Sequence, residues 1–229
     1  MWKEIMSLFK GGGLCKEAFD EAMLMLSESR TMYLDAVEAL HSPGALVADI
    51  YERDRQINRY ERSVRRRIVT HLSISESPDV NMALVLTAIV IDIERIGDYT
   101  KNIAELASVL EAPFDGLELG EDIAEVESLV EDTFGNIARV LEESDEDGAR
   151  TIMAAHGRVA ELVDRDVVRL QRSEVLAGRS GHAVTVALYL RFLKRVSAHL
   201  KNIASSVVNP YDRIGFREKD TEPAPDAPS

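Results

Sequence analysis

The chain contains a single cysteine, Cys15, among its 229 residues. One thiol can form neither an internal disulfide nor a zinc site built from cysteines, and it suits a reducing, cytoplasmic compartment. Long apolar runs are also missing. A membrane span needs roughly 20 apolar residues, whereas the longest run here, residues 82–91, is about half that length and contains Thr87. We therefore expect a soluble protein with at most peripheral membrane contact.

Basic residues are in the minority, with 27 Lys and Arg against 40 Asp and Glu and a net charge of −13. Such a chain is repelled by a phosphate backbone unless its basic residues are strongly segregated, so we expect no nucleic-acid partner. Seven arginines do fall between residues 53 and 67, but Asp54 and Glu61 interrupt them. This pattern favours a solvated, ion-paired face over a patch for phosphate or an acidic partner.

Catalytic motifs are absent from the sequence. The triplet Gly11-Gly12-Gly13 is not followed by Lys and Ser or Thr, so it predicts a flexible hinge and no phosphate-binding loop. The five histidines show no ligand spacing with one another, and no Ser/His/Asp or Cys/His set can be argued from spacing. We therefore expect that the protein is not an enzyme.

Helical periodicity is what the sequence does contain. Seven prolines mark helix ends, because a proline inside a helix costs about 3 kcal/mol. Ser42-Pro43, Ser77-Pro78 and the stretch from Ser144 each place a capping residue at a helix start. Elsewhere apolar residues recur at intervals of three, four and seven, with no competing strand pattern. The prediction is an all-α fold of six long helices, at residues 15–41, 44–73, 78–110, 119–143, 145–173 and 182–208.

A direct repeat divides the chain. Residues 94–104 read ERIGDYTKNIA and residues 194–204 read KRVSAHLKNIA, at an offset of 100. Chance explains this poorly, and it predicts two tandem three-helix-bundle repeats whose apolar stripes pack against each other. The expected parts are an N-terminal segment at 1–14, a first repeat at 15–112, a second repeat at 113–215 and a disordered tail at 216–229.

The first ten residues lack the apolar region and cleavage site of a secretory signal. Trp2, Ile5, Met6 and Phe9 share one helical face. We expect a short helix that packs on its own domain; contact with a membrane surface or a partner is the alternative.

Carboxylates lie on or beside apolar stripes in two predicted helices. Asp54 and Glu61 fall on the stripe of the second long helix, with Asn58 to one side, and Glu94 and Asp98 share a face of the third. A carboxylate on an apolar stripe costs several kcal/mol unless it is paired, binds a cation or reaches water. Facing carboxylates at this spacing suit Mg²⁺, Mn²⁺ or iron, but a salt-bridge network with the nearby arginines explains the same pattern.

The stretch ERIGDYTKNIAE, residues 94–105, resembles the signature of PhoU-domain proteins, the phosphate-uptake regulators. DRQIN, residues 54–58, is similar to the acidic motif on the second helix of that family. The resemblance covers roughly residues 15 to 215 and implies an all-α, non-enzymatic regulator of phosphate transport or phosphate signalling. Its implied partners are a phosphate transporter subunit or an associated sensor kinase at the cytoplasmic face of the membrane, and a homodimer is compatible with it.

Relatives in that family bind metal ions through paired acidic motifs. The resemblance therefore implies one site for a divalent or iron cation at Asp54, Asn58, Glu94 and Asp98, with Glu61 as a further candidate ligand. Asn58 stands where the family usually has a carboxylate, which removes one charge and should weaken cation binding.

The second repeat departs further from the family pattern. Lys194 and Ala198 stand where the last helix would carry Glu and Asp, while His156, Ala160 and Val163 replace the acidic motif of the fifth helix. We expect no second metal site. Two other functions stay open: a metal-binding or metal-storage helical bundle not tied to phosphate, and a helical scaffold without a ligand. The loss of carboxylates in the second repeat argues against storage, which depends on capacity.

Overall fold

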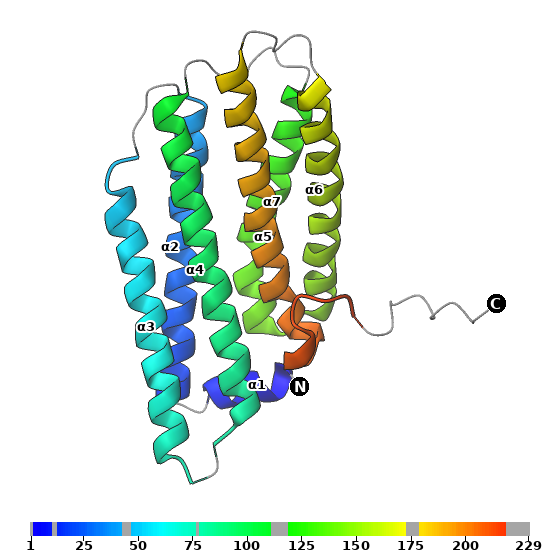
Figure 1. Ribbon diagram of the computed structural model, residues 1–229. Coiled ribbons are helices and arrows are strands. Elements are labelled where there is room, and N and C mark those ends of the chain that lie inside the picture. Colours follow the sequence, from blue (N-terminus) through cyan, green and yellow to red (C-terminus); the bar gives the residue numbers. More distant parts are fainter. Residues whose placement is uncertain are drawn as a thin grey trace, which may run out of the picture.

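The computed structural model of the chain is a bundle of α-helices (Figure 1). The structure describes residues 2–10, 13–42, 47–76, 78–110, 119–172 and 179–218, and no strand occurs in these ranges. The elements are α1 (Trp2–Lys10), α2 (Leu14–Leu40), α3 (Ile50–Ile74), α4 (Val80–Val109), α5 (Gly120–Glu143), α6 (Glu146–Arg172), α7 (Ser180–Val208) and the 3₁₀ turn η1 (Tyr211–Arg213). The all-α prediction is confirmed, but within the described ranges the helices number seven and not six, because α1 adds a short helix to the six long ones.

The long helices form two sets of three. Helices α2, α3 and α4 contact one another, as do α5, α6 and α7, and the two sets meet mainly where α4 packs against α7 (Figure 1). Positions 100 residues apart in the sequence meet at this junction: the rings of Tyr99 and His199 stack with their centroids 5.7 Å apart. This arrangement agrees with the predicted pair of three-helix bundles.

Helix α4 is enclosed by α2, α3 and α7, which explains why its sequence is apolar on nearly every side. Helix α3 is an edge helix by comparison. It buries only Ile50, Ile57, Val64 and Ile68, a single stripe along its length. The remaining faces of α3 are free to carry charge, and this difference sets the chemistry of the junction between the two helices.

Helix α1 crosses the lower end of the bundle in Figure 1 and contacts both α2 and α7. Trp2, Ile5 and Met6 are buried, and Trp2 Nε1 donates a hydrogen bond to the Leu141 carbonyl oxygen at 2.8 Å. The side chain of Phe9 lies outside the described residues. The short N-terminal helix therefore packs on its own domain, as its apolar face predicted.

Helix boundaries agree with the predictions except at the start of α3. This helix begins at Ile50 and not at residue 44, with Asp49 before it in the left-handed region at φ 63°. Pro43 and Ser77, from the two Ser-Pro pairs, lie outside the described residues. Helix α4 is instead capped by Asp79, whose carboxylate accepts from the Met82 backbone N–H at 2.8 Å.

At the start of α6 the capping side chain is Asp145 and not Ser144. Its carboxylate accepts from the Gly148 backbone N–H at 2.9 Å, one residue further along than predicted. Residues 219–229 of the predicted disordered tail lie outside the described residues. Glu218, directly before them, pairs with Arg150 at 2.8 Å.

Candidate functional site

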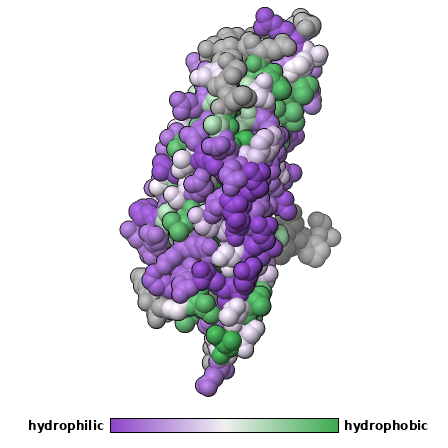
Figure 2. All heavy atoms as spheres, turned by 90° about the vertical axis from the view of Figure 1, so that its left-hand side faces the viewer, coloured by the Kyte–Doolittle hydropathy of each residue, from purple (hydrophilic) through white to green (hydrophobic). Residues whose placement is uncertain are grey.

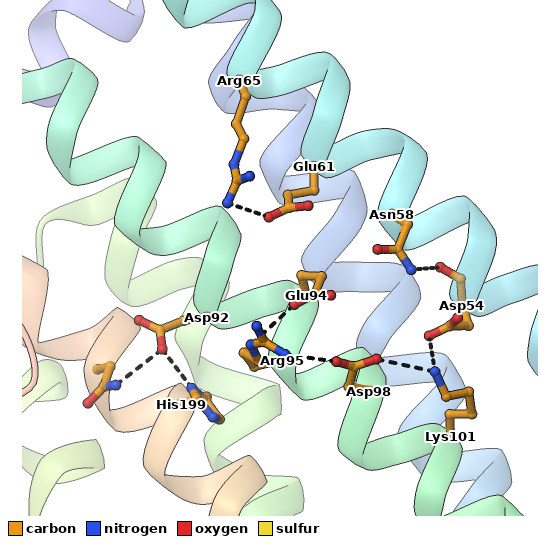
Figure 3. A network of polar contacts seen from close by, with 11 residues as sticks. Asp54, Asn58, Glu61, Arg65, Asp92, Glu94, Arg95, Asp98, Lys101 and His199 are labelled. Atoms are coloured by element: carbon orange, nitrogen blue, oxygen red, sulfur yellow. Dashed lines mark hydrogen bonds and ion pairs between the residues drawn. The ribbon is translucent and has the colours of Figure 1, made fainter.

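The acidic motifs of the two helices meet where α3 packs against α4. Gly97 makes this close contact: a Cβ at position 97 would lie 2.9 Å from Ile57 Cδ1, nearer than such atoms normally approach. The glycine of the signature therefore lets the two helices come together. As a result, the five predicted ligand positions of α3 and α4 line one junction (Figure 3), which we call the acidic junction: Asp54, Asn58, Glu61, Glu94 and Asp98.

A lysine bridges two of these carboxylates. Lys101 Nζ lies 3.1 Å from Asp54 Oδ1 and 3.2 Å from Asp98 Oδ1 (Figure 3). Burial opposes the charged form of Lys101, but the two carboxylates outweigh it and raise the lysine pKa above its ordinary value. Lys101 thus holds α3 and α4 together across the junction.

Arginines neutralise other parts of the acidic junction. Arg95 Nη1 lies 3.2 Å from Asp98 Oδ2, and Arg65 Nη2 lies 2.7 Å from Glu61 Oε1. Asn58 Nδ2 donates a hydrogen bond of 3.0 Å to the backbone carbonyl oxygen of Asp54, one turn earlier in the same helix. This amide N–H is therefore not directed toward the carboxylates (Figure 3).

Glu94 is the least compensated of the carboxylates. Burial, followed by the charge of Asp98, raises its pKa, and Glu61 and Asp54 act in the same direction. Arg95, whose Nε lies 3.5 Å from Glu94 Oε2, opposes this rise in pKa. Glu94 therefore carries a charge that its surroundings disfavour.

The arrangement does not fit a metal ion as the side chains lie. Among the residues that the structure describes, no group of three or more His, Cys, Asp or Glu side chains could together hold a metal. Asp54 and Asp98 bond to Lys101, and Glu61 bonds to Arg65, which is the salt-bridge network that the sequence also allowed. The assignment of these residues as metal ligands stays a prediction.

The corresponding junction between α6 and α7 has different chemistry. His156 Nδ1 lies 3.1 Å from Ser197 Oγ, and Lys194 Nζ lies 2.7 Å from both carboxylate oxygens of Asp164. Burial, helped by Lys201 and Lys194, lowers the pKa of His156 to about 4, so this imidazole is neutral at pH 7. Neutral and cationic groups thus stand where the first unit has carboxylates.

Sequence reasoning missed a polar cluster between α4 and α7. Asp92 is only 9% exposed, yet its Oδ1 lies 2.7 Å from His199 Nδ1 and accepts from Asn202 Nδ2 at 3.1 Å (Figure 3). The signal was an acid that directly follows the apolar run MALVLTAIVI, where a charge needs a buried partner. His199 is half-buried and bonded to this acid.

The arginines of α3 are mostly paired, as predicted. Five of the seven make ion pairs with carboxylates, namely Arg53, Arg55, Arg59, Arg65 and Arg67.

Comparisons with known proteins give a consistent result. Residues 22–107, which run through α2, α3 and α4, match the PhoU domain. The chain is 27% identical over 186 residues to a phosphate-specific transport system accessory protein PhoU homolog from Pseudomonas aeruginosa, covering 76% of this chain and 74% of that protein. The homolog from Pseudomonas putida is 29% identical, covering 76% of this chain and 70% of its own length.

Solved structures show the same fold. The crystal structure of PhoU from Pseudomonas aeruginosa matches with a TM-score of 0.78 and 23% identity, covering 85% of this chain and 95% of that one. The phosphate transport system regulatory protein PhoU from Streptococcus pneumoniae matches with a TM-score of 0.67 and 14% identity, over 86% of this chain and 95% of that one. The domain match, the two relatives and the shared fold agree: residues 22–107 match the PhoU domain, and the chain is similar to PhoU proteins over most of its length.

Proposed function

We propose that the protein is a non-enzymatic accessory regulator of phosphate transport that docks on a transporter subunit or an associated sensor kinase in the cytoplasm. The observation that carries this proposal is the alignment with a phosphate-specific transport system accessory protein over about three quarters of both chains, 76% and 74%. The shared fold extends the likeness to both three-helix units.

The shape and polarity of the bundle support a docking role. None of the described helices is long and apolar enough to cross a membrane. The polar clusters at the helix junctions bond to groups of the bundle itself, as Lys101 does to Asp54 and His156 does to Ser197. The charged side chains on the exposed helix faces are then the groups that would meet a partner.

The test is genetic. Deleting the gene should deregulate phosphate uptake and a phosphate-starvation reporter, and the intact gene supplied in trans should restore both. If uptake and reporter output stay unchanged in both high and low phosphate, the regulatory assignment is wrong. Co-purification of the tagged protein with transporter subunits or a sensor kinase would identify the partner.

The acidic junction offers a second, subordinate role as a cation sensor. Burial and the charges of three neighbouring carboxylates, Asp98, Glu61 and Asp54, raise the pKa of Glu94, and a bound cation would offset their repulsion. Lys101 already supplies a positive charge to Asp54 and Asp98. We infer that any divalent cation competes with Lys101 and binds weakly in the wild-type chain.

A further inference from the structure

The face of α3 that points away from the bundle carries a row of arginines. Arg55, Arg59, Arg62 and Arg66 are all exposed and follow the spacing i, i+4, i+7 and i+11. This spacing places them within about 60° of one another around the helix and along about 16 Å of its length. We call these four residues the arginine row. Figure 2 looks at the α3 side of the molecule, where hydrophilic residues dominate the middle.

Internal ion pairs neutralise only one end of the arginine row. Arg55 and Arg59 share one carboxylate, that of Glu52, each with an N–O distance of 2.7 Å. In the part of the chain that the structure describes, the side chains of Arg62 and Arg66 make no hydrogen bond or ion pair. The face therefore holds four arginines against one carboxylate, a local excess of 4 − 1 = 3 positive charges on a chain of net charge −13.

Packing does not account for the arginine row. The core side of α3 is apolar, with Ile57 and Val64 fully buried. The side toward α2 uses a different arginine, Arg53, which pairs with Glu28 at 2.8 Å and Asp35 at 2.5 Å. The outward row takes part in neither contact, and the cations of Arg62 and Arg66 are available to another molecule.

The chemistry of the row favours a carboxylate-bearing protein over a membrane. Every cation in it is arginine, whose planar guanidinium matches a carboxylate with two parallel hydrogen bonds. Helices that lie in a membrane interface carry apolar side chains all along the inserted face. On α3 the exposed large apolar residues lie toward the two ends of the helix: Tyr51 at one end, and Val69 and Ile74 toward the other.

We propose that the arginine row docks on an acidic helical face of a partner protein, one with carboxylates at i, i+4, i+7 and i+11. A helix with most of this pattern occurs in this chain itself: α5 exposes Glu121, Glu125 and Asp132 at three of those four positions. The inference rests on the proposed function only for where the partner is sought, and its binding chemistry is tested separately.

The probe is a fluorescein-labelled, alanine-based helical peptide with four glutamates at that spacing, titrated with the full chain and followed by anisotropy. Arg62→Gln/Arg66→Gln should weaken binding about tenfold, since two charge-assisted contacts are lost. Raising the salt from 50 to 300 mM should weaken wild-type binding as well. The matched control Arg30→Gln/Arg195→Gln removes the same charge from exposed positions on α2 and α7 and should stay within about twofold of wild type.

Several results would overturn the proposal. Equal losses in both double variants would mean that only net charge matters. Binding to vesicles with 30% phosphatidylglycerol that depends on Arg62 and Arg66, with no effect on the peptide, would assign the row to a membrane. Self-association abolished by the same variant, again without peptide binding, would assign it to a second copy. Thermal unfolding of both variants at the wild-type temperature keeps these comparisons valid.

A measurement of phosphate uptake in cells separates this proposal from the proposed function. If deletion deregulates phosphate uptake but the Arg62→Gln/Arg66→Gln strain behaves like wild type, the arginine row fails and the regulatory role stands. If deletion has no effect while the peptide still binds through the row, the regulatory role fails and the docking chemistry stands.

Discussion

The α3–α4 and α6–α7 junctions occupy equivalent places in the two three-helix units, but their polar groups differ. In the first, Asp54 and Asp98 share the cation of Lys101. In the second, His156 bonds to Ser197 and carries no charge at pH 7. The apolar stripes that pack the helices are retained in both units, so the fold survives while the polar groups at the junction change.

Two lysines at equivalent positions show how much the surroundings matter. In the first unit the pKa of Lys101 is raised, because its two carboxylates outweigh burial. In the second, burial lowers the pKa of Lys201 despite the charge of Asp92, and Arg217 lowers it further. Lys201 donates instead to the carbonyl oxygen of Gly215. The same residue in a duplicated position therefore bridges two carboxylates in one unit and donates to a backbone carbonyl oxygen in the other.

The largest effect is expected at the contact between the units. Asp92 corresponds to Phe192 in the second unit, and the ring centroid of Phe192 lies 6.0 Å from that of Tyr99. Asp92→Ala leaves His199 and Asn202 without their acceptor and should lower the free energy of unfolding by about 3 kcal/mol in urea denaturation.

The control for Asp92 is Asp164→Ala, which removes a 56% exposed acid paired with Lys194 and should cost under about 1 kcal/mol. Equal losses for the two variants would show that the buried cluster contributes no more than a surface pair.

The second effect is a pH dependence that arises from His156 in the second unit. The pKa of His156 is about 4 in the folded chain, below the 6.5 of a free histidine, so the unfolded state binds more protons between these values. Stability should therefore fall by about 2 kcal/mol between pH 7 and pH 5. His156→Gln should remove that part of the slope in urea denaturation at the two pH values. An unchanged slope would mean that His156 does not titrate differently on folding.

The third effect concerns cation binding in the first unit. Lys101→Met removes the positive charge between Asp54 and Asp98, which should lower the free energy of unfolding by about 1 kcal/mol. It should also tighten Mn²⁺ binding about tenfold, measured by calorimetry. Lys194→Met is the matched change in the second unit and should leave Mn²⁺ binding unchanged. If neither wild type nor Lys101→Met binds Mn²⁺, the acidic junction is an ion-pair network and no metal site.

The smallest effect is a stabilisation. Burial and Asp98 raise the pKa of Glu94, so the folded chain disfavours its charged form, and this penalty appears as pH rises through the folded pKa. Glu94→Gln should raise the free energy of unfolding by about 0.5 kcal/mol at pH 7, with the difference fading toward pH 4, where the carboxyl is protonated. A gain of the same size at pH 4 would point to packing as the cause.

Most of the fold could be predicted because helix periodicity is local. The ends of five long helices lie within a few residues of their predicted places, and the exception is the start of α3 at Ile50. The choice of Asp145 over Ser144 as the cap of α6 depends on which oxygen reaches the Gly148 N–H. Spacing alone does not decide between neighbouring candidates of this kind.

The site was predictable in its positions and not in its bonding. Residue spacing placed Asp54 and Asp98 on facing helices, and the repeat marked the second unit as different. Whether those carboxylates meet a metal, one another or Lys101 depends on side-chain directions across the contact between Gly97 and Ile57. The helices, the duplication and the residues at each junction follow from the sequence, because periodicity and capping act over a few residues. Which charges pair, and which arginines of α3 form ion pairs, follows from the packing of separate helices, because that packing sets the distances between their side chains.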